Sequence, residues 1–204
     1  SIQMQFHSSC LRTDVPLQMF LPQPSFGADP DQRDTSGAEI DQNSPSRANA
    51  VANKPSCAEW TESASMERFR VLYLFHGLSE DQTAWMRHSA MERLAEPRRL
   101  AVVMPHLGRS FGVDTMRGAR YAHFIEEELP AFVQSLFPVS RAPSDTFLAG
   151  CDMGGYAAFH AAFRHPERYA AVAALSAPLD LHTLFDIPDE EIHQELVSVF
   201  GSWD

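Results

Sequence analysis

Apolar and polar side chains alternate at the start of the chain. In the run Ile2–His7 each apolar residue is followed by a polar one, and Leu17–Leu21 is a second short apolar run. A period of two is typical of a strand that buries one face. The two runs therefore predict an antiparallel pair of strands at the beginning of a sheet.

Four later runs are mostly apolar and lack this alternation. They are Val71–Phe75, Leu100–Met104, Asp145–Ala149 and Ala170–Leu175. Continuous apolar runs of this length are typical of parallel strands that helices cover on both faces. They predict the buried middle of the sheet.

Between these runs, apolar residues recur at steps of three and four. This spacing predicts helices over Thr83–Ala95, Arg117–Phe137 and Asp189–Phe200, and Pro130 should bend the second of them. Strands that alternate with helices give a mostly parallel sheet with helices on both faces. The expected fold class is α/β.

The stretch from Pro22 to Ser65 has a different composition. It is rich in Pro, Ser, Asp, Asn, Gln and Ala and has few large apolar side chains. Such a segment buries too little surface to offset the entropy lost on ordering. We interpret residues 22–65 as a long, mobile surface insertion in one domain of residues 1–204, a length that can bury a single core.

Composition and charge restrict the partners. The chain is 44% hydrophobic and 21% charged, as in ordinary soluble domains, and its net charge is −11. A negative protein is a poor match for nucleic acid or for an anionic membrane, since both carry negative charge. We also find no apolar run long enough to span a bilayer. The start of the chain has no apolar run preceded by Lys or Arg, the pattern of a signal peptide.

The three cysteines are scattered, with no Cys-x-x-Cys spacing: they are Cys10, Cys57 and Cys151. This pattern argues against a disulfide framework and against a zinc site, and it favours a reducing, cytoplasmic location. No cofactor or metal is implied. Because the chain starts at Ser1 rather than Met, removal of a signal peptide stays open.

The candidate chemistry centres on residues 147–156. Here an apolar run passes through Gly150 and Gly154 into an Ala-rich segment. Glycine is needed where a turn brings backbone against backbone. The pattern predicts a strand, a sharp turn and a helix, which is the nucleophile elbow of an α/β-hydrolase. The residue at the apex is Asp152, where the usual Gly-x-Ser-x-Gly pattern has serine.

Six short motifs occur in an order that resembles one known group of proteins, the esterase D family of α/β-hydrolases. That family includes S-formylglutathione hydrolases and small esterases that cleave tributyrin or acetyl esters. The resemblance extends from about Phe69 to Asp180. The motifs are Leu74–Ser79, Val103–Pro105, Gly108–Phe111, Glu127–Pro130, Ala149–Tyr156 and Arg164–Arg168.

The resemblance implies a mechanism in which serine attacks an ester, histidine takes its proton and aspartate orients the histidine. Two backbone N–H groups hold the oxyanion. By position these donors are Leu78, which follows His76 and Gly77, and Met153 after the apex.

The resemblance also assigns substrate binding to Gly77 and to three side chains that line the acyl pocket. They are Trp85, Arg109 and Phe111. For each of them, packing in the core or in a loop is an equal alternative. A small-molecule ester is the implied ligand, and formation of a homo-oligomer stays open.

Two features depart from the family pattern. Asp152 replaces the nucleophilic serine. The family's acid and histidine follow a strand end that corresponds here to Ser176–Asp180, on later strands, and this chain ends at Asp204. We therefore expect the fold to lack its C-terminal strands, as a fragment, a cleaved piece or a truncated relative.

Asp152 itself allows several interpretations. Gly-x-Asp-x-Gly also resembles haloalkane dehalogenases and epoxide hydrolases, in which the carboxylate attacks an sp³ carbon. Against a carbonyl ester, a carboxylate would form an anhydride that reverts. A purely structural role, capping the N-terminus of the Ala-rich helix, is favoured over a nucleophilic one.

None of the nine histidines has the spacing of a metal site or an evident route to the apex, and His76 is expected to shape its loop. Asp180 is retained as a candidate triad acid, while Ser176 and Cys151 are expected to be structural. The sequence thus predicts an esterase-like hydrolase of short acyl esters or thioesters that Asp152 impairs. The alternative is a non-catalytic pseudo-esterase used for binding or assembly.

Overall fold

The computed structural model describes residues 1–23 and 68–202. The predicted insertion, residues 22–65, lies almost wholly outside these ranges and stays a prediction. In the described residues, no helix is long and apolar enough to cross a membrane.

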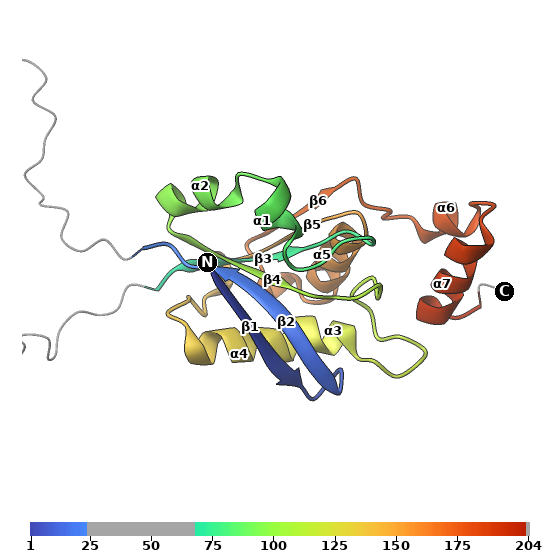
Figure 1. Cartoon of the computed structure of the whole chain (residues 1–204), viewed down its shortest axis with the longest axis horizontal. Coiled ribbons are helices and arrows are strands. Elements are labelled where there is room, and N and C mark those ends of the chain that lie inside the picture. Colours follow the sequence, from blue (N-terminus) through green and yellow to red (C-terminus); the bar gives the residue numbers. More distant parts are fainter. Residues whose placement is uncertain (24–67, 203–204) are drawn as a thin grey trace, which may run out of the picture. The chain divides into compact units, whose positions relative to one another are not determined.

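Six strands of the described residues form one sheet, in the order β1-β2-β4-β3-β5-β6 (Figure 1). The pairs β1–β2 and β2–β4 are antiparallel, and the other three pairs are parallel. The predicted antiparallel start and parallel middle are both confirmed. The strands are β1 (Ile2–Ser8), β2 (Thr13–Phe20), β3 (Arg70–Phe75), β4 (Leu100–Pro105), β5 (Thr146–Cys151) and β6 (Ala171–Leu175).

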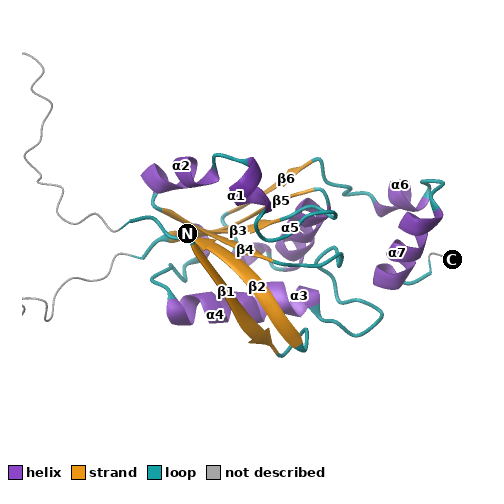
Figure 2. Cartoon of the chain, viewed as in Figure 1, coloured by secondary structure: helices purple, strands orange, loops and turns teal. Residues whose placement is uncertain are grey.

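Helices lie on both sides of this sheet, with α2 and α4 on opposite sides (Figure 2). Side chains of α4, α5 and α7 share one core cluster with β3, whereas α2 packs with Leu74 and Val102 in a second cluster. The helices are α1 (Ala84–His88), α2 (Met91–Ala95), α3 (Tyr121–His123), α4 (Leu129–Leu136), α5 (Met153–Arg164), α6 (Leu181–Phe185) and α7 (Glu190–Phe200).

The helix predicted over residues 83–95 is wrong in its continuity, because α1 and α2 are separate. The hydroxyl of Ser89 donates to the carbonyl of Trp85 and accepts from the N–H of Met91. A serine side chain that bonds to nearby backbone competes with the helical ladder. The apolar spacing is the same in one helix and in two, so it did not indicate the break.

The helix predicted over residues 117–137 begins at Tyr121 and contains a π-turn at Phe124–Glu128. Pro130 lies in the first turn of α4, directly after the π-turn. Because Pro130 has no N–H, the carbonyl of Glu126 loses its helical donor. The guanidinium of Arg168 donates to that carbonyl instead, at 3.2 Å.

Candidate active site

The turn between β5 and α5 is as tight as the glycine pattern predicts. A Cβ on Gly150 would lie 2.3 Å from the carbonyl carbon of Gly154. A Cβ on Gly154 would lie 2.5 Å from the carbonyl oxygen of His76, on the neighbouring loop. Asp152 occupies the apex with φ 50° and ψ −126°, a conformation that costs a residue other than glycine free energy. The predicted strand–turn–helix is confirmed.

The carboxylate of Asp152 lies against the loop after β3. The N–H of Leu78 donates to Oδ2 of Asp152 at 2.8 Å. The backbone of the apex is also fixed, since its N–H donates to the carbonyl of Leu175 at 2.9 Å and its own carbonyl accepts from Gly155 and Tyr156. The side chain therefore points across the corner to the Leu78 amide.

This geometry corrects our interpretation of Asp152 as a helix cap. The carboxylate accepts no hydrogen bond from the first turn of α5. The left-handed backbone of the apex turns the side chain away from those N–H groups and towards Leu78. Met153 is the first residue of α5, where a backbone N–H has no partner within the helix. The two N–H groups that the resemblance assigns to the oxyanion thus belong to the two backbone segments that meet at this corner.

His76 is held as a structural residue. It is fully buried, its Nε2 accepts the N–H of Leu107 at 2.9 Å, and its Nδ1 lies 2.8 Å from the carbonyl of Gly77. Because Leu107 can only donate, the ring proton is on Nδ1, and both nitrogens are occupied. Burial lowers the pKa of His76, so the ring is neutral. Its expected loop-shaping role fits this geometry.

A second carboxylate, from Glu80, lies beside Asp152. Oε2 of Glu80 accepts the N–H of Gly77 at 3.3 Å and lies 3.9 Å from the sulfur of Cys151. A Cβ added to Gly77 would lie 3.4 Å from both Oδ2 of Asp152 and Oε2 of Glu80. Both carboxylate oxygens therefore approach Gly77 near the point where a Cβ would lie, and their negative charges are close together at the corner.

This charge also affects Cys151. Burial raises the pKa of its thiol, and the nearby Glu80 and Asp152 raise it further. A thiolate is the nucleophilic form of cysteine. Cys151 is therefore a protonated, half-buried thiol, in agreement with its expected structural role.

A small pocket of about 100 Å³ lies next to the corner. Trp85 forms part of its wall, and its indole N–H donates to the carbonyl of Phe75 at 3.0 Å, so this side chain both lines the pocket and anchors α1 to β3. The lining residues are Glu80, Ala84, Trp85, His88, Ser89 and Cys151.

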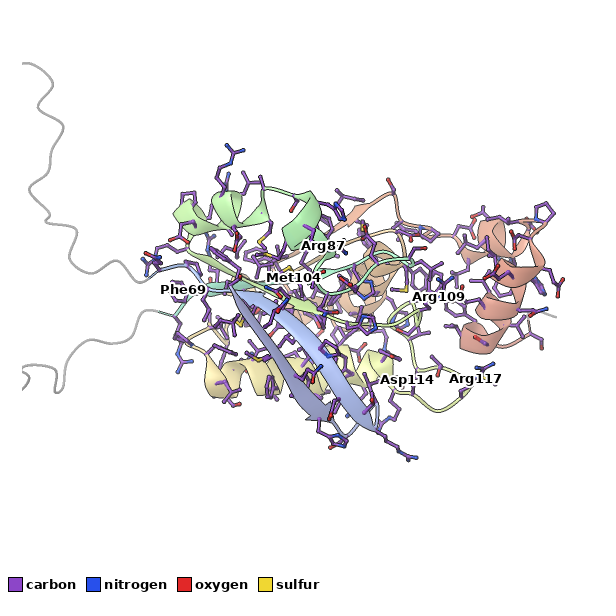
Figure 3. All side chains as sticks on the ribbon, viewed as in Figure 1. Phe69, Arg87, Met104, Arg109, Asp114 and Arg117 are labelled. Atoms are coloured by element: carbon purple, nitrogen blue, oxygen red, sulfur yellow. The ribbon has the colours of Figure 1, made fainter. Side chains whose placement is uncertain are left out.

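The other two side chains assigned to the acyl pocket do not line this cavity. Arg109, which is labelled in Figure 3, forms a two-pronged ion pair with Glu195 of α7. This pairing raises the pKa of the guanidinium. Phe111 is 3% exposed, with its ring 5.4 Å from that of Phe200 and 5.9 Å from that of Tyr156. For Phe111 the structure corresponds to the core-packing alternative, because so buried a ring has no free face for a ligand.

Among the described residues, no side chain forms a hydrogen bond with the Asp152 carboxylate, so no base is in place there. Asp180 is occupied as the N-cap of α6, where it accepts the N–H of His182 at 3.0 Å. Sequence reasoning missed Glu80 and Glu195. An acidic residue three positions after Gly77 was a usable signal for Glu80, whereas Glu195 had none, since it lies far along the chain.

The order of the strands, the helices on both sides and the sharp corner before α5 define an α/β-hydrolase. A family model described as "Putative esterase" matches residues 58–198. The match covers most of the chain, and the chain belongs to this esterase family. The suspected relation to small esterases and S-formylglutathione hydrolases is confirmed.

Several relatives are longer than this chain. An acetyl esterase of Caldicellulosiruptor saccharolyticus is 29% identical over 125 residues, which are 61% of this chain and 47% of that esterase. FphF, a fluorophosphonate-binding serine hydrolase of Staphylococcus aureus, is 25% identical with a TM-score of 0.74, over 98% of this chain and 65% of FphF. The S-formylglutathione hydrolase FrmB of the same organism is 24% identical with a TM-score of 0.70, over 96% of this chain and 65% of FrmB. The expected fold class is confirmed, and the chain spans about half to two thirds of these relatives.

Proposed function

We propose that the chain carries the elbow and oxyanion corner of a hydrolase for short acyl esters or thioesters, and that Asp152 prevents ordinary esterase turnover. The observation that carries the proposal is the 2.8 Å hydrogen bond from Leu78 N–H to Oδ2 of Asp152. The amide that would stabilise the oxyanion of an ester substrate is taken by a carboxylate of the protein itself.

The chemistry of a carboxylate nucleophile supports the same conclusion. Attack of Asp152 on an ester carbonyl would form an anhydride and expel an alkoxide. The carboxylate is by far the better leaving group, so the tetrahedral adduct returns to the ester. Charge acts in the same direction, because the carboxylates of Asp152 and Glu80 both lie close to Gly77 and oppose a developing oxyanion.

A comparison of three proteins tests this proposal. The 204-residue protein, Asp152→Ala and Asp152→Ser are assayed with p-nitrophenyl acetate in a non-nucleophilic buffer. We expect the first two to match the buffer rate and Asp152→Ser to exceed them by at least about tenfold, because only this variant combines a hydroxyl nucleophile with backbone N–H donors that are free to hold the oxyanion. Turnover by the unchanged protein that Asp152→Ala abolishes would show that Asp152 is a working nucleophile.

A second candidate function is non-catalytic binding of a small neutral ligand. The pocket that Trp85 lines is open next to the elbow and holds about 100 Å³, enough for a short acyl chain. Two carboxylates nearby, Asp152 and Glu80, disfavour an anionic ligand. Butanamide should therefore stabilise the protein against heat, butyrate should not, and Trp85→Ala should remove the effect. Equal shifts with both compounds would exclude this function.

A further inference from the structure

A second cavity, of about 180 Å³, lies at the opposite end of β5 from the elbow. Thr146, the first residue of β5, forms part of its wall, whereas Asp152 follows the last residue of that strand. At about 30 Å³ for each water-sized group, the cavity has room for about six non-hydrogen atoms. Polar or charged side chains in its wall include Tyr73, Glu126, Arg141, Arg168 and Tyr169.

Two buried oxygen atoms in this wall have no hydrogen-bond partner within the described residues. One is the hydroxyl of Tyr73, a residue that is 2% exposed, and the other is Oε1 of Glu126, which is 7% exposed. Nε of Arg164 lies 3.5 Å from Oε1 without the geometry of a hydrogen bond, and Oε2 lies 3.2 Å from Nε2 of His165. Buried polar groups are nearly always hydrogen-bonded, so these two oxygens together indicate a binding site.

The hydroxyl of Tyr169 is a third oxygen in the same wall. Burial, and next the carboxylate of Glu126, raise the pKa of Tyr169 to about 12. Burial, and next Tyr169, raise the pKa of Tyr73 as well. These mutual effects agree with three neighbouring groups, and both phenols stay protonated at neutral pH.

The three oxygens together select one kind of ligand group. The Glu126 carboxylate can only accept a hydrogen bond, while Tyr73 and Tyr169 each have an O–H to donate. An aliphatic hydroxyl matches this set, because it donates one hydrogen bond and accepts two. An ammonium group has no acceptor for the phenol protons, and a carboxylate has no proton for Glu126 and shares its negative charge.

Arg141 adds a positive charge at the rim of the cavity. This exposed side chain forms no ion pair within the described part of the chain, and its one hydrogen bond there is a long one, 3.5 Å to the carbonyl of Gln134. Arg168, in contrast, already donates to the carboxylate of Glu127 at 2.7 Å. A guanidinium that is not engaged by an acidic side chain binds a carboxylate through two parallel hydrogen bonds. The rim therefore favours a ligand that carries a carboxylate beside its hydroxyl.

We propose that this cavity binds a small α-hydroxycarboxylate. The hydroxyl of the ligand lies among Glu126, Tyr73 and Tyr169, and its carboxylate meets Arg141 at the rim. No residue of the elbow takes part, so the inference goes beyond the proposed function and does not depend on Asp152.

A comparison of four small compounds with the 204-residue protein tests the site. The probes are lactate, propionate, propylene glycol and alanine, and their dissociation constants are measured by NMR titration. Propionate lacks the hydroxyl of lactate, propylene glycol lacks the carboxylate, and alanine has an ammonium group in place of the hydroxyl. We expect lactate to bind at least about tenfold more tightly than each of the other three, because each leaves a buried or charged group without its partner.

Matched variants assign the contacts. Tyr73→Phe removes one O–H and keeps the ring, and it should weaken lactate binding at least about tenfold. Arg141→Gln should weaken lactate binding to a similar degree and leave the weak binding of propylene glycol unchanged. Tyr156→Phe is the control, because Tyr156 lies on α5 and does not line the cavity, and it should bind lactate normally. Asp152→Ala should also bind lactate normally, whatever its rate in the ester assay, which separates this inference from the proposed function.

The stability of Tyr73→Phe in the absence of any ligand is a second measurement. Because the hydroxyl has no partner in the described part of the folded chain, its removal should leave the urea midpoint unchanged or raise it. A lower midpoint would show that the hydroxyl is already hydrogen-bonded in the folded protein, and the proposal would be wrong.

Three binding results would also overturn the proposal. Lactate could fail to bind, it could bind no better than propionate, or it could bind Tyr73→Phe as tightly as the unchanged protein. The first result would mean that the cavity holds solvent alone, and the other two would mean that the buried oxygens do not contact the ligand.

Discussion

The amide of Leu78 and the carboxylate of Asp152 form a 2.8 Å hydrogen bond across the corner between β3 and α5. Two segments 74 residues apart in the chain are thereby joined at the position where the esterase pattern has a serine hydroxyl. The same residue has a strained backbone, with a positive φ of 50°. A substitution at the apex therefore changes the backbone strain and the hydrogen bond together.

Two separate variants, Asp152→Gly and Asp152→Ala, should distinguish the effect of backbone strain on stability from the effect of the hydrogen bond. Both Asp152→Gly and Asp152→Ala lose the bond to Leu78, but only glycine adopts this backbone conformation without strain. We expect Asp152→Gly to be more stable than Asp152→Ala by about 1–3 kcal/mol. Urea unfolding measures the difference, and equal midpoints would contradict it.

Gly154→Ala should be one of the most damaging small substitutions in the molecule. Its Cβ would lie 2.5 Å from the carbonyl oxygen of His76, and this backbone cannot move without disturbing β3. We expect a loss of about 3 kcal/mol. The matched control is Gly77→Ala, whose Cβ would meet its neighbours at 3.4 Å, an ordinary contact, and which should cost much less. Similar losses in the two variants would mean that the corner is looser than described.

The elbow could be predicted from sequence because its constraint is local. Gly150 and Gly154 are required by backbone contacts within a few residues and one adjacent loop. The strands were predictable for a similar reason, because their burial leaves a continuous apolar run. The direction of the Asp152 side chain was not predictable, since it depends on the φ of the apex and on a partner amide in another segment.

Two predicted helices differ from a regular α-helix in ways that the sequence did not indicate: one is divided at Ser89, and the other contains a π-turn before Pro130. The spacing of apolar residues indicates which face of a helix is buried. It is nearly unchanged when Ser89 interrupts the backbone hydrogen bonds of the helix. Pro130 was expected to bend its helix by removing one backbone hydrogen bond. The carbonyl of Glu126, which loses that bond, accepts one from the distant side chain of Arg168 instead. That compensation lies 42 residues away in the chain and leaves no local pattern.

His76 should make stability depend on pH. Burial lowers the folded-state pKa of His76, whereas in the unfolded chain it returns to about 6.5. Above pH 6.5 both states are neutral and the contribution is complete. As the pH falls from 6.5 towards the folded-state pKa, the unfolded chain takes up a proton that the folded ring does not, and stability is lost.

His76→Gln tests this dependence. The amide of glutamine can accept the Leu107 N–H and donate to the Gly77 carbonyl, as the neutral ring does, but it does not titrate. The variant should be somewhat less stable at pH 8 and should lose less stability between pH 7 and pH 5 than the unchanged protein. Parallel curves of unfolding free energy against pH would show that another group titrates in this range.

Arg168 should stabilise the π-turn that precedes Pro130. Its guanidinium donates to the Glu126 carbonyl at 3.2 Å and to the Glu127 carboxylate at 2.7 Å. Arg168→Met keeps much of the side-chain volume and leaves that half-buried carbonyl without a donor, which should cost about 2 kcal/mol. Arg168→Lys should fall between the two, because a single ammonium lacks the forked geometry that reaches both oxygens.

The cost of Arg168→Met should also change with pH. The hydrogen bond from Arg168 lowers the pKa of Glu127 below its ordinary value of 4.5. The pair therefore contributes its full stability above pH 4.5 and loses it as the pH falls through the folded-state pKa. The difference in unfolding free energy between the unchanged protein and Arg168→Met should be largest at pH 7 and should decrease in acid. The difference that remains in acid is the contribution of the hydrogen bond from Arg168 to the Glu126 carbonyl. A gap that is constant from pH 7 to pH 3 would assign the whole effect to that carbonyl.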